Sequence, residues 1–129
     1  MEEKIVICII ENNKKELLLQ KKTWDYPFYP GMWCFSGGKA ESEDLNKEIK
    51  RELKEEIGIK LKPKFLFNQK IILANHRLIF YVFFAKLNDI SKVKIGEGAG
   101  IAFFGKEELK NLNFNPINKK ILNRYFKEF

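Results

Sequence analysis

Four glutamates in one short segment have the spacing that would put their carboxylates on the same face of a helix. At about 100° per residue, Glu48, Glu52, Glu55 and Glu56 share an arc of about 100°. Like charges four residues apart destabilise an isolated helix by a few tenths of a kcal/mol, so this face is unfavourable unless a cation lies on it. Carboxylate oxygens are ligands that Mg²⁺ and Mn²⁺ prefer. The spacing therefore indicates a divalent-cation site, with a solvated acidic surface as the alternative.

The helix that would carry these glutamates is predicted over residues 44–58 and ends at Gly58, a residue type typical of the position after a helix. A second face of this helix is apolar and is expected to pack on the core; it consists of Ile49, Leu53 and Ile57. Lysines occupy a third, solvated face. Arg51 falls beside the carboxylates. The helix is thus predicted to have one buried side and one side available for chemistry.

Short apolar strands separated by turns and helices are predicted for the rest of the chain. The predicted strands span residues 5–10, 17–19, 32–35, 64–69, 77–86 and 101–104, and further helical segments span 106–109 and 118–129. The first two strands are expected to form a hairpin. The strand over 77–86 is nearly all apolar and is expected to be buried on both faces. This mixture predicts an α/β or α+β layered domain.

Length and composition favour one folded domain over residues 1–129. The chain is 45% hydrophobic and 14% aromatic, which excludes a disordered protein. Cys8 and Cys34 are expected to be buried reduced thiols, because two cysteines make no disulfide framework. Met1 is followed by two acids and no long apolar segment, and the longest apolar runs are far shorter than the ~20 residues of a membrane helix. We therefore predict a cytoplasmic protein with no membrane partner.

The net charge of +7 at first suggests a nucleic-acid partner. However, bidentate recognition of phosphates and bases favours arginine, and the basic residues are almost all lysine. Seven of the 17 acidic residues are also concentrated between Glu41 and Glu56. Nucleic acid is therefore an unfavoured partner, and the acidic segment is the feature to explain.

A glycine pair precedes the acidic helix and changes its interpretation. Gly37-Gly38 joins a predicted strand to the helix, and such a junction lets the backbone approach a ligand closely. The spacing is Gly37, five residues, Glu43, seven residues, then the unbroken run from Arg51 to Ile59. This segment resembles the Nudix box, G-x5-E-x7-R-E-U-x-E-E-x-G-U with U aliphatic, at every fixed position of the pattern.

The resemblance to Nudix hydrolases, and to their MutT-like members, implies a fold and a chemistry. It implies an α/β/α sandwich with a mixed β-sheet between helices, and metal-assisted attack of water on a nucleoside diphosphate linked to another group X. The implied ligands of Mg²⁺ (or Mn²⁺) are Glu52, Glu55, Glu56, Glu97 and a carbonyl of Gly37 or Gly38. Glu52 or Glu56 would activate the water, and Arg51 would pair with Glu43 to hold the loop.

Two positions of the resemblance leave alternatives open. Many relatives have a loop after the glycine pair that is one residue longer, so either Gly37 or Gly38 can be the glycine whose carbonyl faces the metal. Glu97 resembles a metal ligand from a later loop, but it can also be an ordinary surface acid.

The substrate side of the site is predicted from aromatic and polar residues near the box. Aromatic rings can stack a nucleobase, and Tyr and Trp suit half-solvated pockets. The candidate substrate-binding residues are Trp24, Tyr26, Tyr29, Trp33, Lys39 and Asn115. Core packing is the alternative for the aromatics, and entry into a helix before Pro116 is the alternative for Asn115.

The resulting functional hypothesis is a MutT-like (d)NTP pyrophosphohydrolase that releases a nucleoside monophosphate and pyrophosphate. A first alternative keeps the chemistry but takes ADP-ribose, another nucleotide sugar or a dinucleoside polyphosphate. A second alternative is a non-catalytic nucleotide-sensing or RNA-binding Nudix domain, which need not keep Arg51 together with three glutamates. The expected partner is a small-molecule nucleotide, and the expected assembly is a monomer or a homodimer.

Overall fold

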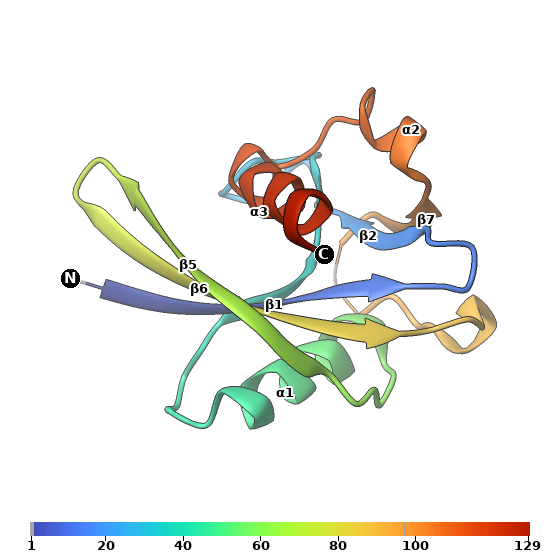
Figure 1. Cartoon of the computed structure of the whole chain (residues 1–129), viewed down its shortest axis with the longest axis horizontal. Helices are drawn as coiled ribbons and strands as arrows, with labels where there is room; N and C mark the ends of the chain where they lie inside the picture. The colour runs from blue at the N-terminus through green and yellow to red at the C-terminus, as the bar shows by residue number, and fades with distance from the viewer. Residues whose placement is uncertain (1, 97) are drawn as a thin grey trace.

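A parallel pair of long strands, β1 (Glu2–Glu11) and β6 (His76–Lys86), forms the centre of the fold in a computed structural model (Figure 1). The structure describes residues 2–96 and 98–129. The sheet has the order β3-β2-β1-β6-β5, with β4 paired to β1 and β7 paired to β2. The further strands are β2 (Leu17–Lys21), β3 (Trp33–Cys34), β4 (Ser36–Lys39), β5 (Lys64–Leu73) and β7 (Gly100–Phe104). Parallel and antiparallel pairs occur together, so the sheet is mixed.

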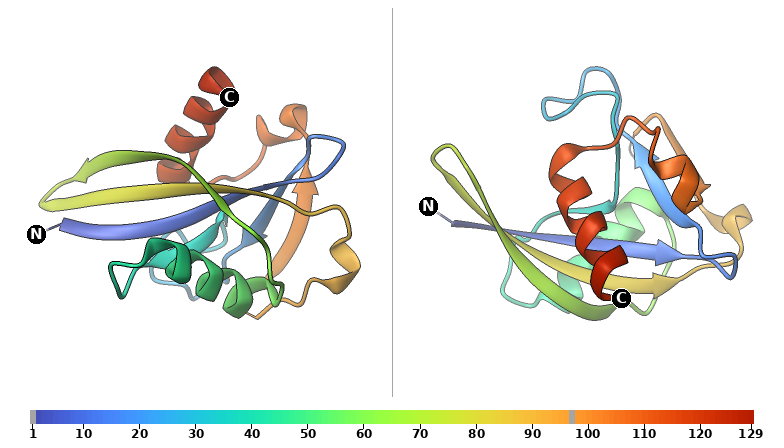
Figure 2. Two further views of the ribbon diagram at one scale, coloured as in Figure 1. Left: turned by 60° about the horizontal axis from the view of Figure 1, so that its bottom comes forward. Right: turned by 45° about the horizontal axis from the view of Figure 1, so that its top comes forward.

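Helices cover both faces of the sheet (Figure 2). Helix α1 (Leu45–Ile57) packs on one face and α3 (Pro116–Glu128) on the other, while α2 (Lys106–Leu109) and the 3-10 turn η1 (Ile90–Lys92) are short connections. Strand β1 is continuously apolar because both of its faces are buried. Ile7 and Ile9 belong to the core under α3, whereas the intervening Cys8 belongs to the core under α1. The predicted α/β/α sandwich is confirmed.

Several sequence predictions agree with these elements. Strands β1 and β2 form the expected antiparallel hairpin, and β6 contributes side chains to the cores on both faces of the sheet. Cys8 and Cys34 are buried and unpaired by disulfide, as expected. No helix in the described part of the chain is both long and apolar enough to cross a membrane.

Several element boundaries differ from the prediction, and two of them involve candidate site residues. The glycine pair was expected to end a strand, but Gly37 and Gly38 pair with Ile7 and Val6 as part of β4. Glycine has little strand propensity, so its inclusion depends on the neighbouring strand rather than on the local sequence. Helix α3 begins at Pro116, two residues earlier than predicted, because the Asn115 side chain caps it and proline suits the first turn.

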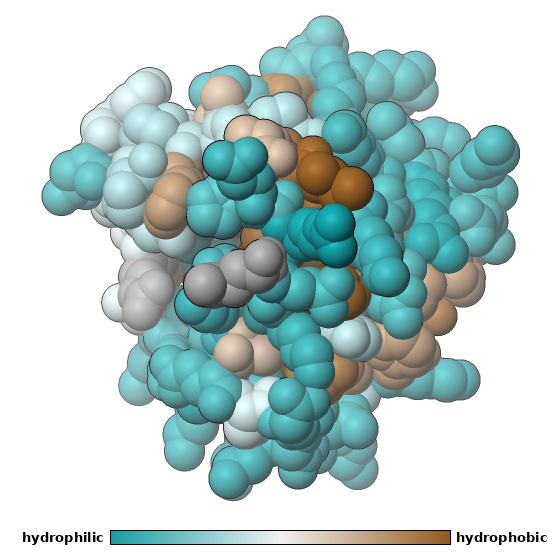
Figure 3. Space-filling view, turned by 90° about the vertical axis from the view of Figure 1, so that its left-hand side faces the viewer, coloured by the Kyte–Doolittle hydropathy of each residue, from teal (hydrophilic) through white to brown (hydrophobic). Residues whose placement is uncertain are grey.

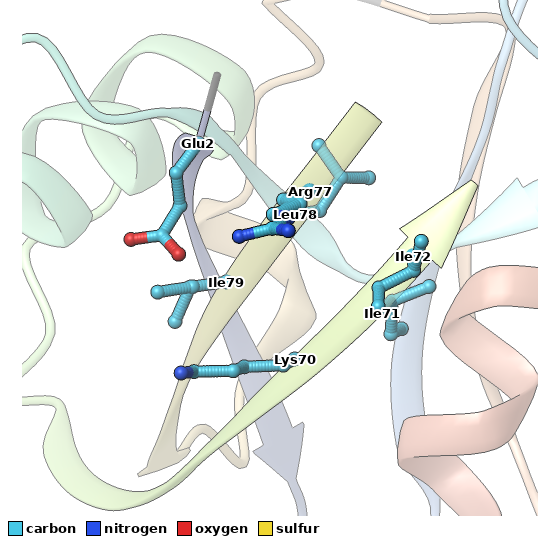
Figure 4. A pocket seen from close by; sticks show the side chains of 7 residues that line it. All are labelled: Glu2, Lys70, Ile71, Ile72, Arg77, Leu78 and Ile79. Atoms are coloured by element: carbon cyan, nitrogen blue, oxygen red, sulfur yellow. The ribbon is translucent and has the colours of Figure 1, made fainter. Parts of the chain in front are cut away.

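The β5–β6 hairpin and the start of β1 extend beyond both helices at one end of the molecule (Figure 1). A shallow groove at this end includes Lys70, Ile72, Arg77 and Ile79 in its lining, with Glu2 beside them (Figure 4). Seen from this side, the surface is mostly hydrophilic with small apolar patches (Figure 3). The groove contains none of the predicted site residues, most of which lie on or near α1.

Candidate active site

Helix α1 has the three-faced arrangement that its sequence predicts. Its N-terminus is capped by the Asp44 side chain, which accepts from the Lys47 N–H, and Gly58 ends it with a left-handed φ of 69°. The apolar stripe of Ile49, Leu53 and Ile57 is fully buried against the sheet. This packing sets the rotation of the helix about its axis. The glutamate face is therefore directed toward β4, where the glycine pair lies.

Glu56 is the most deeply buried glutamate of this face, with 2% of its surface exposed. Gln20 on β2 donates from Nε2 to Oε2 of Glu56 across 2.5 Å, and the Gly37 N–H donates to Oε1 across 2.6 Å. The ammonium of Lys22 lies 3.6 Å from the same Oε2. Burial raises the pKa of Glu56 to about 7, against the opposing effects of these donors. A carboxylate with such a pKa can accept a proton near neutral pH.

The two glycines of β4 face two different glutamates. A Cβ atom on Gly38 would lie 2.8 Å from the carboxylate oxygens of Glu52, so only glycine leaves room for that side chain. Gly37 has a φ of 154°, and a Cβ atom there would lie 2.0 Å from the carbonyl oxygen of Val6. Gly37 is thus required by the sheet and Gly38 by the helix glutamate.

Arg51 forms ion pairs with the other three glutamates of this helix face. Its Nη2 lies 3.0 Å from Oε1 of Glu48 and 3.1 Å from Oε1 of Glu52, and its Nη1 lies 3.1 Å from Oε2 of Glu55. A fourth carboxylate, that of Glu41 in the loop, lies 4.0 Å from Nη2. These acids raise the pKa of Arg51 above its usual range. Arg51 therefore offsets the repulsion between carboxylates, as its place on the helical wheel predicts.

The expected pairing of Arg51 with Glu43 is wrong. Glu43 is 87% exposed at its side chain and forms an ion pair with Lys4 of β1. The loop from β4 to α1 brings the Glu41 N–H and the Ser42 hydroxyl to Glu48, so the carboxylate beside Arg51 comes from the helix. These hydrogen bonds and Arg51 lower the pKa of Glu48. Glu48 was noted only as part of the acidic arc, and its burial could not be read from the sequence.

The donors on α1 fit a hard divalent cation by chemistry. Glu52, Glu55 and Glu56 offer only oxygen atoms as ligands. Because Gly38 has no Cβ atom, the carboxylate of Glu52 can lie next to the backbone of the glycine pair. Within residues 2–96 and 98–129, no three His, Cys, Asp or Glu side chains converge on one point in this conformation. Arg51 instead pairs with Glu52 and Glu55, and Glu56 accepts hydrogen bonds from Gln20 and Gly37.

Glu97 lies outside the described residues, so its expected role as a metal ligand stays a prediction. Its neighbour Gly96 donates its N–H to the carbonyl of Glu56 across 2.9 Å. A Cβ atom on Gly96 would lie 1.9 Å from the carbonyl oxygen of Glu55. The chain before residue 97 is thus held directly against the last turn of α1.

The aromatic candidates divide into two groups. Trp24 is 74% exposed in the loop before β3, and Lys22 places its ammonium 4.5 Å from the centre of the Tyr26 ring. Because Lys22 also lies beside Glu56, Tyr26 is linked to the site. Tyr29 and Trp33 instead pack against the core under α3. For these two residues the structure supports the core-packing alternative.

The two polar candidates are engaged elsewhere in the fold. Lys39 is exposed and lies 3.7 Å from a carboxylate oxygen of Glu3. The Asn115 side-chain oxygen accepts from the N–H groups of Ile117 and Asn118, which is the helix-entry role left open by the sequence. Asn118 is buried and accepts the Phe35 N–H across 2.9 Å, so it ties α3 to the strand that leads into the glycine pair.

Gln20, Lys22 and Asn118 are the functional candidates that sequence reasoning missed, while Glu48 was placed on the acidic face without its role in holding the loop. One signal pointed to Gln20, because it is a polar residue at the end of the apolar run of β2. Lys22 and Asn118 are ordinary polar residues in their segments. Their roles depend on contacts between segments far apart in the chain.

Comparisons with known proteins agree with this geometry. The NUDIX domain family matches residues 1–125 of the chain. The nucleoside triphosphatase NudI of Klebsiella pneumoniae is 36% identical over 61 residues, which are 47% of this chain and 44% of that relative. The chain therefore matches less than half the length of this curated relative.

Solved structures of similar fold cover the chain almost completely. The MutT protein of Methanosarcina mazei Go1 superposes with a TM-score of 0.83 at 24% identity, over 98% of this chain and 94% of that chain. A MutT structure from a study of Aliivibrio salmonicida and Vibrio cholerae has a TM-score of 0.78 at 26% identity, over all of both chains. These comparisons and the glutamate face of α1 point to the same family.

Proposed function

This chain belongs to the Nudix family, and from that premise we propose that it hydrolyses a nucleoside triphosphate to a nucleoside monophosphate and pyrophosphate. The observation that carries the proposal is the position of Glu56, a buried carboxylate of raised pKa held between Gln20, Gly37 and the cation of Lys22. The name of the relative NudI, a nucleoside triphosphatase, supports a triphosphate as the substrate.

The cation of this reaction would be held by Glu52, Glu55 and Glu56, with Glu97 and a carbonyl of Gly37 or Gly38 as further candidates. Mg²⁺ is our first choice and Mn²⁺ the second, since both take carboxylate and phosphate oxygens together. When bound, such an ion neutralises charge on the phosphate oxygens and acidifies water. Arg51 pairs with Glu52 and Glu55 in this conformation, so these two carboxylates would exchange contacts with the guanidinium for contacts with the ion when it binds.

The residues of the chain account for the movement of the proton. The oxygen of water forms a bond to phosphorus, the bond from phosphorus to the bridging oxygen breaks, and the carboxylate of Glu56 accepts the proton. Gln20 and Gly37 hold the two oxygens of Glu56, so the carboxylate cannot turn away during the step. Lys22 supplies positive charge next to the same carboxylate, where phosphate charge develops. Tyr26 and Trp24 lie beyond Lys22 as the candidates to stack the base.

A substrate panel with product identification tests the proposal. The purified chain is incubated with Mg²⁺ or Mn²⁺ and each canonical (d)NTP, ADP-ribose, a nucleotide sugar and a dinucleoside polyphosphate. We expect at least one triphosphate to be cleaved to a monophosphate and pyrophosphate, and the labelled oxygen of ¹⁸O-water to identify the phosphorus attacked. Glu128→Gln, which removes an exposed acid on α3 that pairs with Arg124, is the matched control and retains the wild-type rate.

The outcomes of the panel separate the alternatives. Faster turnover of ADP-ribose, a nucleotide sugar or a dinucleoside polyphosphate would replace the substrate and keep the chemistry. Binding of nucleotides without turnover under either metal would overturn the enzymatic proposal in favour of a sensing domain. Tight binding of RNA that weakens steeply with salt would favour the RNA-binding alternative.

A further inference from the structure

The loop between β4 and α1 must be held in place, because it connects the glycine pair to the glutamate helix. Three glutamates lie near this connection: Glu41, whose exposed carboxylate is 4.0 Å from Nη2 of Arg51, Glu43 and Glu48. Glu43 is the glutamate at the box position, but its exposed carboxylate pairs with Lys4 on β1 rather than with any group of α1 described above. Glu48 belongs to the first turns of α1 and is buried. Glu48 is therefore the buried carboxylate that connects the loop to the helix.

Glu48 receives hydrogen bonds from both sides of the connection. Its Oε1 accepts the backbone N–H of Glu41 across 2.5 Å, and its Oε2 accepts the Ser42 hydroxyl across 3.3 Å. The same Oε1 accepts from Nη2 of Arg51 across 3.0 Å. One buried carboxylate thus joins two consecutive loop residues to the guanidinium.

The orientation of the guanidinium depends on these contacts. The Nε atom of Arg51 is buried and has no hydrogen-bond partner in the described structure, so its two Nη groups set the orientation. Nη2 is shared by Glu48 and Glu52, and Nη1 contacts Glu55. Nη2 also donates to the carbonyl of Lys39 across 3.5 Å and lies 4.0 Å from the exposed carboxylate of Glu41. Losing the charge of Glu48 would leave only these two longer contacts between the guanidinium and the loop.

We infer that Glu48, rather than Glu43, is the positioning residue that fixes Arg51 and the loop, and through them the glutamates of the reaction. The effect on catalysis that we infer for Glu48 rests on the proposed function. The effect on the loop and on Arg51 rests only on the hydrogen bonds of Glu48. It assigns to a residue within α1 the role that the box pattern assigns to the loop glutamate.

The kinetic test compares three Glu→Gln variants on the best substrate of the panel. Glu48→Gln keeps the size of the side chain and removes its charge, and we expect kcat to fall about 10- to 100-fold with a much smaller change in KM. Glu43→Gln should lose clearly less, because its ion pair with Lys4 is exposed. Glu107→Gln, at an exposed acid of α2, is the matched control. A larger loss for Glu43→Gln than for Glu48→Gln would overturn the inference, as would a Glu48→Gln effect confined to KM.

Hydrogen exchange gives a second readout that does not need turnover. The amide of Glu41 is expected to exchange faster in Glu48→Gln than in the wild type, while Glu43→Gln leaves its protection in place. If Glu48→Gln fails to fold, Glu48→Asp keeps the charge on a shorter side chain and should show the same faster exchange. Unchanged protection in a folded Glu48 variant would overturn the inference. A chain that hydrolyses no nucleotide would refute the proposed function, and this measurement would still decide the role of Glu48.

Discussion

Gln20 on β2 and Glu56 on α1 form a buried hydrogen bond of 2.5 Å between residues 36 positions apart in the chain. Gln20 is 1% exposed, so water is excluded from the amide and the bond restricts the carboxylate directly. A residue outside the Nudix box thereby controls a residue inside it.

Replacing Gln20 by Met should lower activity much more than stability. Methionine has a similar length and fills the same apolar strand position, but it cannot donate to Glu56. We expect kcat to fall about tenfold or more, with the circular dichroism spectrum unchanged. Gln69→Met on β5 is the matched control, because the Oε1 of Gln69 is buried without a described hydrogen-bond partner. Equal activities of the two variants would contradict the role of Gln20.

The two glycines of β4 should respond differently to alanine. Gly37→Ala places a Cβ atom against the Val6 carbonyl at a φ of 154°, so it should lower the free energy of unfolding by about 2 kcal/mol or more. Gly38→Ala displaces only the carboxylate of Glu52, so it should lower kcat while the melting temperature changes little. Urea unfolding and steady-state kinetics on both variants check this, and a reversal of the two patterns would refute the assignment.

The pH dependence of stability should depend on Glu56 when metal is removed with EDTA. Its pKa is raised to about 7 in the folded chain from 4.5, so the folded state binds the proton more tightly. The contribution of Glu56 to the free energy of unfolding is therefore fully present below pH 4.5. It is lost as the pH rises through about 7, which lowers the free energy of unfolding by up to about 3 kcal/mol. Glu56→Gln removes this loss. Urea unfolding at pH 5, 6, 7 and 8 measures the free energy of unfolding of both proteins, and that of Glu56→Gln should increase relative to that of the wild type as the pH rises. A difference that is the same at every pH would contradict the raised pKa.

Divalent metal should stabilise the wild type and not the variants that lose a ligand. Binding to the folded chain alone raises the melting temperature with concentration, because it shifts the unfolding equilibrium. Glu52→Gln and Glu55→Gln should each weaken this shift for Mg²⁺ and Mn²⁺, and Glu128→Gln should not. Thermal melts in a metal titration measure it, and an equal shift in all four proteins would place the cation elsewhere.

Local periodicity already determines much of this molecule. The spacing of Ile49, Leu53 and Ile57 predicts which side of α1 is buried, and the structure confirms it because that stripe packs on the sheet. The strands, the hairpin and the layered fold follow from the same kind of pattern, and the Nudix box identifies the family from a run of 23 residues. Each of these features depends on residues close together in the chain, where helix and strand geometry alone sets which side chains share a face.

The partners of the site glutamates were decided by tertiary structure. The donors to Glu56 come from β2 and β4, and the loop acid Glu43 forms an ion pair with Lys4 on β1, whereas the pair of Glu48 with Arg51 is an i,i+3 contact that helical spacing already permits. Hydrogen bonds between side chains of different elements need alignment within a few tenths of an ångström. Helical or strand spacing cannot specify that alignment, because it arises only when the core side chains have set how α1 lies on the sheet.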